Sequence, residues 1–245
     1  MGTYKRYPLT LVRGKGCWVW DVSGNRYLDA VAGIATCSLG HSDRALRRSL
    51  SLQLNKVQHL SNLFRIPEQE ELALWLVKHS CAESVFFCNS GAEANEAAIK
   101  LARKFGHQRR GIDKPVILSS HGSFHGRTLA AMSATGQPKY HKGFEPVVEG
   151  FEFFPYNDLA AFEKLLTSLE SKGPRVAAVL IEPLQGEGGI NPGNSYFFKR
   201  LRELCTKHQI LLIFDEIQVG MGRTGNWWGY QQLKVEPDAF TLAKG

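Results

Sequence analysis

The sequence has no apolar run long enough to cross a lipid bilayer. Its longest aliphatic runs are Val176–Ile181 and Ile210–Phe214, whereas the hydrocarbon core of a bilayer needs about 20 apolar residues. Near the N-terminus, a short apolar patch is broken by Pro8, Thr10 and Arg13, so no secretory signal can be drawn. We therefore expect a water-soluble protein without a membrane partner.

Cysteine is also scarce. The 245 residues include 5 cysteines, an odd number without a Cys-x-x-Cys pair, which favours reduced, structural thiols and a cytoplasmic location over a disulfide framework. The 24 glycines and 10 prolines follow no repeating period, which excludes collagen-like and low-complexity proteins.

Several signatures of common catalytic sites are missing. The sequence has neither a G-x-S-x-G nor a G-x-x-x-x-G-K-[ST] run, so the hydrolase and P-loop classes lose their main support. His121 and His125 have a spacing that would suit a metal on a helix, but Gly122 and Gly126 disfavour a helix there. No third ligand follows at a usual spacing, and we expect no metal site.

The net charge is +7, and its distribution matters more than its size. The densest basic stretches are residues 44–48 and 100–114, and neither has the interleaved aromatic side chains that stack on nucleic-acid bases. We therefore expect no nucleic-acid partner. Sites for small carboxylate or phosphate metabolites are a better use of the excess positive charge.

The first 80 residues predict a small β element followed by helices. Cys17–Asp21 and Arg26–Leu28 flank the turn signal Gly24-Asn25, which is typical of a hairpin. Leucines spaced four apart predict an amphipathic helix over Asp43–Leu60, and Pro67 starts another helix.

From residue 85 onward, strand-like and helix-like segments alternate. The predicted strands are Val85–Cys88, Val116–Ser119, Val176–Ile181, Ile210–Phe214 and Ala239–Leu242. The predicted helices are Ala92–Phe105, Asp158–Leu169 and Tyr196–His208. Continuous apolar strands are typical of strands buried on both faces, so we predict an α/β fold with a mostly parallel sheet. His121–Gly150 is expected to be an extended functional loop.

Polar residues directly follow four of the predicted strands: Asn89–Glu93, Glu182, Asp215 and Lys244. Ligands bind beyond the carboxyl ends of the strands in an open parallel sheet. A single polar residue at such a place is more often a cap or a turn former. Together, the four predict a crevice lined by a helix N-terminus, two carboxylates and a lysine.

Ser90 and Glu93 have the spacing of a capping box at the start of a helix. Small residues follow Ser90, so the first backbone N–H groups of this helix can approach an anion such as phosphate. A capped helix without a ligand explains this feature equally well.

Lys244 and Asp215 suggest a particular cofactor. A lysine next to a buried strand has its pKa lowered by desolvation and can form a Schiff base with a carbonyl compound. An aspartate can hold a protonated heterocyclic nitrogen. With a phosphate-binding helix, these are the parts that pyridoxal phosphate requires. Glu182 and Glu187 could instead form a general acid–base pair, but Pro183 and nearby glycines put them in a loop of undefined geometry.

At this point the sequence resembles the class III pyridoxal-phosphate-dependent aminotransferases of fold type I. The motifs that carry the resemblance are, in order, NSGAEANEAAIKLARK (89–104), SFHGRT (123–128), IEPLQGEGG (181–189), LLIFDEIQVGMGRTG (211–225) and LAKG (242–245). The resemblance implies that residues 1–60 belong to a small domain and residues 61–245 to a large cofactor-binding domain. It also implies a homodimer, and a chain that stops before the family's C-terminal part.

The resemblance assigns roles to individual residues. The implied cofactor-binding residues are Ser90, Gly91, Ala92, Phe124, Asp215, Ile217, Gln218 and Lys244. Gly91 and Ala92 would offer their backbone N–H groups to the phosphate. Phe124 would stack on one face of the pyridine ring, and Ile217 would lie against the opposite face. Lys244 would also be the catalytic base, and Arg127 and Glu187 would bind substrate.

Within the class, the segments Asp29–Ala35 and Leu39–His41 are most similar to acetylornithine aminotransferases. Ile34 stands where ornithine aminotransferases tend to have a tyrosine. The expected reaction moves the δ-amino group of N2-acetylornithine to 2-oxoglutarate. Ornithine, succinylornithine and 4-aminobutyrate transaminases are the alternatives, with a mutase of the same fold behind them. A chain of another class, which binds the cofactor or a partner without turnover, is a further alternative.

Overall fold

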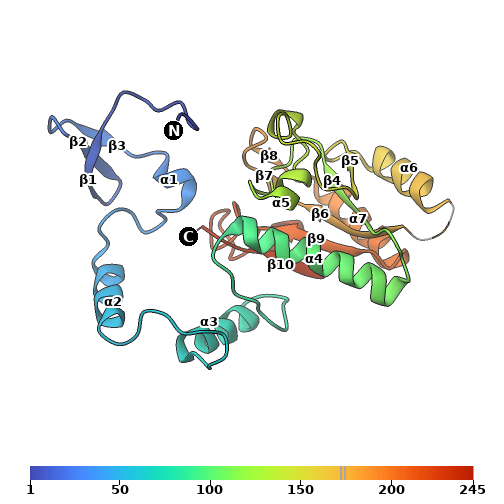
Figure 1. Ribbon diagram of the computed structural model, residues 1–245, viewed down its shortest axis with the longest axis horizontal. Helices are drawn as coiled ribbons and strands as arrows, with labels where there is room; N and C mark the ends of the chain where they lie inside the picture. The colour runs from blue at the N-terminus through green and yellow to red at the C-terminus, as the bar shows by residue number, and fades with distance from the viewer. Residues whose placement is uncertain (172, 174, 245) are drawn as a thin grey trace. The chain divides into compact units, whose positions relative to one another are not determined.

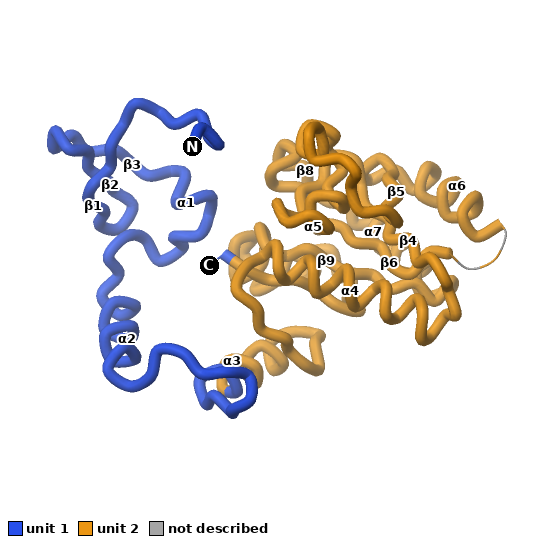
Figure 2. The backbone as a smooth tube through the Cα atoms, viewed as in Figure 1, with its two compact units in different colours: residues 1–70, 244–245 blue, residues 71–243 orange. Residues whose placement is uncertain are grey.

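The computed structural model of the protein describes residues 1–171, 173 and 175–244 (Figure 1). Gly245, the last residue of the LAKG motif, lies outside the described residues. The chain divides into two compact units, residues 1–70 with Lys244, and residues 71–243 (Figure 2). The predicted domain boundary at residue 60 stays a prediction, because it refers to the small and large domains of the family that the sequence resembles and not to these compact units. In the described part of the chain, no helix is long and apolar enough to span a membrane.

The first unit contains a three-stranded antiparallel sheet and short helices. Its strands are β1 (Leu11–Lys15), β2 (Trp18–Asp21) and β3 (Arg26–Leu28), in that order across the sheet. The predicted hairpin is thus confirmed, and β1 is an addition to it. The helices are α1 (Ala32–Ala35), α2 (Arg44–Leu54) and the start of α3 (Pro67–Lys78).

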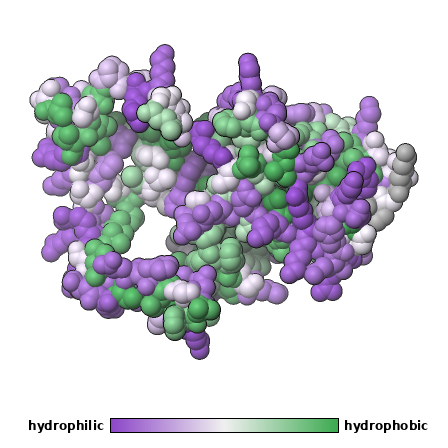
Figure 3. All heavy atoms as spheres, in the orientation of Figure 1, coloured by the Kyte–Doolittle hydropathy of each residue, from purple (hydrophilic) through white to green (hydrophobic). Residues whose placement is uncertain are grey.

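The side chain of Asp43 accepts the backbone N–H of Leu46, as expected for the N-cap of α2. The prediction was wrong about the end of this helix, which stops at Leu54 because Asn55 caps it. The leucine stripe of α2 is exposed, with Leu46 and Leu50 at 48% and 55%. Hydrophobic side chains therefore reach the surface of this unit (Figure 3).

The second unit is built on a five-stranded sheet in which all neighbouring strands are parallel. Its order is β10 (Ala239–Thr241), β9 (Leu211–Asp215), β6 (Val176–Ile181), β4 (Val116–Ser120) and β5 (Phe151–Phe154). This confirms the predicted α/β class with a mostly parallel sheet, and four of the five predicted strands.

Helices cover both faces of this sheet (Figure 1). α4 (Gly91–Arg110) packs on one face through Ala98, Ile99 and Ala102, which meet Ala178 and Leu180 of β6. α6 (Leu159–Glu170) and α7 (Ser195–Lys207) pack on the other face. Successive side chains of a strand point to opposite faces of its sheet. β6 therefore packs against the helices on both faces, and all six of its residues are buried. These three helices match the predicted ones.

The loop expected over His121–Gly150 contains more regular structure than its composition suggests. It includes the short helices α5 (Leu129–Ser133) and η1 (Pro138–Tyr140). The remaining elements are β7 (Leu184–Gln185), β8 (Asn191–Pro192) and α8 (Gly229–Leu233).

The strand predicted over Val85–Cys88 is wrong. The segment is extended, and its side chains alternate between half-buried and exposed, with Phe86 73% exposed. It forms no ladder with any strand in the described ranges. This short continuous apolar run therefore belongs to a segment packed at the edge of the core, with Val85 and Phe87 against it, and not to a member of the sheet.

Candidate functional site

The carboxyl ends of the parallel strands gather the predicted polar residues at one edge of the sheet. β4, β6, β9 and β10 end at Ser120, Ile181, Asp215 and Thr241. Because these strands are parallel neighbours, the loops that follow them lie at the same edge.

Asp215 is the centre of a buried hydrogen-bond network at this edge, and it is only 3% exposed. Its Oδ2 accepts a hydrogen bond from Nδ2 of Asn95 at 2.8 Å and lies 2.7 Å from Nδ1 of His125. Its Oδ1 accepts the backbone N–H of Ile217 at 3.1 Å. When the carboxylate is ionised it can only accept, so the His125 tautomer that fits carries its hydrogen on Nδ1.

The partners of Asp215 are themselves held in place. Asn95 is completely buried, donates to the backbone oxygen of His125 at 2.6 Å, and accepts the hydroxyl of Thr241 at 2.8 Å. Nε2 of His125 lies 3.2 Å from the Ser119 hydroxyl. Fully satisfied buried networks of this kind fix one geometry, so the orientation of the Asp215 carboxylate is set by four elements of the fold.

The donor set around Asp215 fits a protonated ring nitrogen. An ionised carboxylate offers about four acceptor positions, and Asn95, His125 and Ile217 fill three of them. The remaining position is on Oδ1. The pyridine nitrogen of pyridoxal phosphate is the kind of donor that would fill it by a charge-assisted hydrogen bond.

The N-terminus of α4 lies at the same edge. The Ser90 hydroxyl accepts the backbone N–H of Glu93 at 3.2 Å, while Oε2 of Glu93 accepts the backbone N–H of Asn89 at 2.7 Å. The predicted capping box is therefore present, with the glutamate reaching one residue further back than in the standard motif. The N–H groups of Gly91 and Ala92 precede the first intrahelical bond, from Ala94 to Ser90, and are donors to an anion.

Close packing surrounds the first turn of α4. A methyl group at Gly91 would lie 2.9 Å from Cδ1 of Ile217, and one at Gly126 would lie 2.9 Å from Cβ of Ala92. The loops after β9 and β4 thus touch the helix start directly. This brings Gly91, Ala92 and Ile217 together.

A buried carboxylate fixes the backbone of Phe124. Its N–H donates to Oε2 of the buried Glu182 at 3.2 Å. Burial, together with the negative charge of Asp215, raises the pKa of Glu182 well above its usual value. The ring of Phe124 meets Tyr140 edge-on, with centroids 5.4 Å apart, and Cζ of Arg127 lies 5.7 Å from the Phe124 centroid.

Glu187 is held by residues of the η1 turn. Its Oε1 accepts the Tyr140 hydroxyl at 2.5 Å and Nζ of Lys139 at 3.2 Å, and its Oε2 accepts Nε2 of Gln137. Partial burial raises the pKa of Glu187, but the hydrogen bonds from Tyr140, Gln137 and Lys139 outweigh it, so the pKa is lowered overall. Glu187 is therefore a carboxylate at neutral pH.

Two further predicted residues lie beside this edge in different ways. The Gln218 side chain packs over Gly186, where a methyl group would lie 2.7 Å from its Cγ. Lys244 follows Thr241, the last residue of β10, by three positions, has a φ of 60°, and belongs to the first compact unit. Its side chain is exposed, so the burial expected around its amine is not seen.

Sequence reasoning missed Asn95 and the role of His125. Asn95 is the polar member of the stripe that α4 buries, with Ala98, Ile99 and Ala102, and such a residue signals a buried hydrogen-bond partner. The spacing of His125 from His121 suggests only a metal ligand and gives no sign of a contact with Asp215. His121 is exposed and stacks on Phe153 instead. The described residues contain no group of three or more His, Cys, Asp or Glu side chains placed to share a metal.

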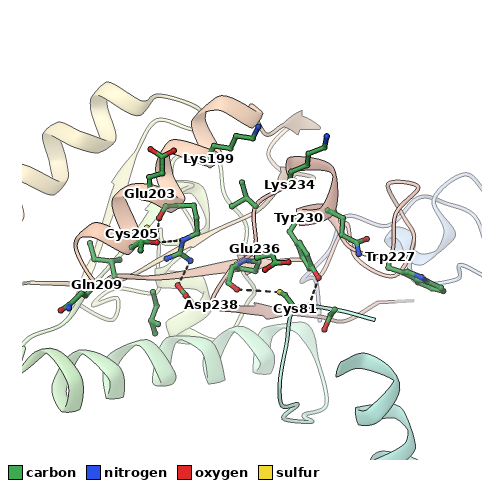
Figure 4. Close-up of a pocket in the computed structure, with 18 of the residues that line it drawn as sticks. Cys81, Lys199, Glu203, Cys205, Gln209, Trp227, Tyr230, Lys234, Glu236 and Asp238 are labelled. Carbon is green, nitrogen blue, oxygen red and sulfur yellow. Dashed lines mark hydrogen bonds and ion pairs between the residues drawn. The ribbon is translucent and has the colours of Figure 1, made fainter. Parts of the chain in front are cut away.

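A large cavity lies at the opposite edge of the sheet. It has a volume of about 1530 Å³ and is lined by residues at the amino ends of β9 and β10 and by Cys81 and Tyr230 (Figure 4). There, Nη1 of Arg202 lies 2.8 Å from Oδ2 of Asp238. None of the predicted site residues lines it, so this cavity is separate from the candidate site.

The family model for the class-III aminotransferases matches residues 2–245. The chain belongs to this family. Class-III aminotransferases use pyridoxal 5′-phosphate, and the fit at Asp215 and at the α4 N-terminus agrees with that cofactor.

Curated members of the class-III aminotransferases cover the whole chain. A Prochlorococcus marinus acetylornithine aminotransferase is 78% identical over 245 residues, and one from Parasynechococcus marenigrum is 73% identical. Both alignments include 100% of this chain but only 59% and 58% of the relatives. The chain therefore spans somewhat more than half the length of the curated class-III relatives that it matches.

Solved class-III aminotransferase structures have the same fold. The ornithine aminotransferase of Toxoplasma gondii matches with a TM-score of 0.92 at 34% identity, covering 100% of this chain and 57% of that one. The N-acetylornithine aminotransferase of Stenotrophomonas maltophilia matches with a TM-score of 0.82 at 44% identity, covering 98% and 59%. A second Toxoplasma structure has partial occupancy of pyridoxal phosphate at its active site.

Proposed function

We propose that this chain supplies the cofactor-binding part of an acetylornithine aminotransferase, which moves the δ-amino group of N2-acetylornithine to 2-oxoglutarate. The observation that carries the proposal is the 78% identity, over the whole chain, to a protein named for that activity. The Asp215 network and the open start of α4 supply the chemistry that such an enzyme needs.

When bound, pyridoxal phosphate supplies an electron-poor ring that makes a hydrogen on the substrate carbon acidic. The residues of this chain would set its position and charge. The N–H groups of Gly91 and Ala92 bind the phosphate, with Ser90 capping their helix, and Asp215 keeps the ring nitrogen protonated. Phe124, Ile217 and Gln218 would be the residues that hold its ring.

Three charged residues would handle the substrate. Lys244 would hold the cofactor, and its Nζ would accept and return a proton at the reacting carbon of the substrate. Arg127 binds a substrate carboxylate, for which its planar guanidinium is suited. Glu187 faces the substrate and helps the site to accept two different substrates in turn.

The proposed site has a direct test. Sodium borohydride should fix pyridoxal phosphate on the peptide that contains Lys244, which mass spectrometry of a digest detects, and it should bleach the visible absorbance of the holoenzyme. Lys244→Ala should abolish both signals. Cofactor fixed on a different lysine in the unaltered protein would refute the assignment.

An ornithine aminotransferase is the second candidate, because the fold match to the Toxoplasma enzyme has a TM-score of 0.92. Steady-state rates with acetylornithine, succinylornithine, ornithine and 4-aminobutyrate as donors, and 2-oxoglutarate as acceptor, separate these activities. We expect the largest kcat/KM for acetylornithine. A larger value for free ornithine would favour the second candidate.

We further infer that residues 1–245 alone do not turn over substrate, that the working enzyme is a homodimer, and that it is cytoplasmic. The first inference is supported by the greater length of the relatives named for this activity. An assay of the 245-residue chain tests it, and robust transamination would refute it. Light scattering of the active enzyme tests the homodimer.

A further inference from the structure

Four side chains form a connected group that we call the Glu187 cluster. Its members are Gln137, Lys139, Tyr140 and Glu187. The three donors come from the turn that includes η1, and they lie 47 to 50 residues before Glu187 in the sequence. One short segment therefore determines where this carboxylate lies.

Tyr140 is the member with the most contacts. Its hydroxyl donates to Oε1 of Glu187 at 2.5 Å, and its ring meets Phe124 at 63° with centroids 5.4 Å apart. Cζ of Arg127 lies 5.5 Å from the centroid of the same ring. A single side chain thus contacts the carboxylate of Glu187, the guanidinium of Arg127 and the ring of Phe124.

Lys139 and Tyr140, the two donors within η1, do not hold Glu187 equally. Lys139 is 62% exposed, and exposed ion pairs contribute little because water and salt screen them. Tyr140 is half-buried, and burial together with the neighbouring Glu187 raises its pKa, so its hydroxyl remains a donor at neutral pH. A fixed ring that donates to a charged group is the stronger restraint.

We propose that Tyr140 is a positioning residue that fixes the Glu187 carboxylate and so determines how well the site accepts the dicarboxylate substrate relative to the amino donor. The inference rests on the proposed function. 2-Oxoglutarate brings two carboxylates into the site and acetylornithine brings one. An oriented, hydrogen-bonded Glu187 repels the additional carboxylate less than an unrestrained one, because its charge is directed toward its donors.

The test is Tyr140→Phe in the purified holoenzyme, which keeps the ring against Phe124 and Arg127 and removes the hydroxyl. The KM for 2-oxoglutarate should rise about three- to tenfold, which is the net loss expected for one typical hydrogen bond in a partly exposed site. The KM for the amino donor should change less than about twofold on the same reasoning. The dissociation constant of glutarate, a dicarboxylate that cannot react, should rise in calorimetry by the same factor as the 2-oxoglutarate KM.

Two control variants isolate the hydroxyl. Tyr196→Phe removes a tyrosine hydroxyl from an exposed position on α7 and should leave both KM values unchanged. Lys139→Met removes the exposed ion pair and should raise the 2-oxoglutarate KM by less than Tyr140→Phe does. An effect of Lys139→Met larger than that of Tyr140→Phe would overturn the assignment.

The two proposals fail in different ways. If the unaltered holoenzyme does not transaminate, the proposed function is wrong. If it does, and Tyr140→Phe changes the KM values of donor and acceptor equally, or changes neither KM nor the glutarate dissociation constant, only the inference about Tyr140 is wrong.

Discussion

Nδ1 of His125 lies 2.7 Å from Oδ2 of Asp215, although the two residues are 90 positions apart in the sequence. The His125 imidazole and the Asn95 amide both form hydrogen bonds with Oδ2 of Asp215. Oδ1 accepts the backbone N–H of Ile217, in the loop after β9. Asp215 is therefore oriented by its neighbours before any ligand binds.

Asp215→Asn should greatly weaken the proposed cofactor site. A neutral amide cannot keep a ring nitrogen protonated, and the loss of a charge-assisted hydrogen bond costs about 1.5–3 kcal/mol, or roughly tenfold to more than 100-fold in affinity. Fluorescence titration of the apoprotein with pyridoxal phosphate measures this change in affinity. Asp113→Asn, at an exposed loop position, is the matched control and should bind normally.

Asn95→Ala should destabilise the fold of the second unit. The change leaves the Thr241 hydroxyl and the His125 carbonyl oxygen without their partner in a fully buried place, and each such loss costs about 1–3 kcal/mol. Urea denaturation should show a fall in the free energy of unfolding within that range or above it. Asn226→Ala, at an exposed position, should leave the midpoint unchanged, and an equal effect of both variants would contradict the assigned role.

Glu216 should make the stability depend on pH. It is fully buried and accepts the N–H groups of Gly229 and Tyr230 at 2.6 and 2.7 Å. Burial raises its pKa to about 7 from the usual 4.5. The folded state then holds a proton that the unfolded state releases, so the unfolding free energy falls as the pH rises from about 4.5 to 7.

The fall attributable to Glu216 is on the order of 3 kcal/mol, and it levels off above pH 7. Chemical denaturation at several pH values measures this fall in the unfolding free energy. Glu182, whose pKa is also raised, contributes in the same direction, so the comparison must be between the unaltered protein and Glu216→Gln. Parallel stability–pH curves for the two proteins would refute the prediction.

Gly126→Ala should disturb the start of α4. Gly126 has a φ of +141°, and an added methyl group would lie 2.9 Å from Cβ of Ala92 and 3.0 Å from Cβ of Ala131. We expect a loss of about 1–3 kcal/mol in stability and a weaker affinity for pyridoxal phosphate. Gly111→Ala is the control for backbone strain alone, because it has a φ of +64° and open space around it. It should destabilise by about 1–2 kcal/mol and leave cofactor affinity unchanged.

The layered fold was predictable from the sequence because its signals are local. Continuous apolar runs predicted β6 and β9, and the helix-like segments that alternate with the strands predicted α4 and α7. The Val85–Cys88 strand was wrong because a short apolar run indicates contact with the core, while membership of a sheet depends on a partner strand. α5 was missed since five residues among glycines and histidines are too few for a period to be recognised.

The site was predictable where each residue adjoins a strand end or belongs to a recognised motif. Asn95 was not, because its partners are 30, 120 and 146 positions away and no local pattern encodes such contacts. The Tyr140 contact with Glu187 depends in the same way on two loops that meet only in the folded chain.

The hydrogen bond between Asn95 and Thr241 has a consequence for synthesis on the ribosome. The two residues are 146 positions apart. At a translation rate of about 5–20 residues per second, Thr241 is therefore synthesised roughly 7 to 30 s after Asn95. During that interval α4 and the earlier strands exist without β9 and β10. The nascent chain thus holds α4 for seconds on a sheet that still lacks these two strands, and this is the stage at which a chaperone would most benefit the yield of folded protein.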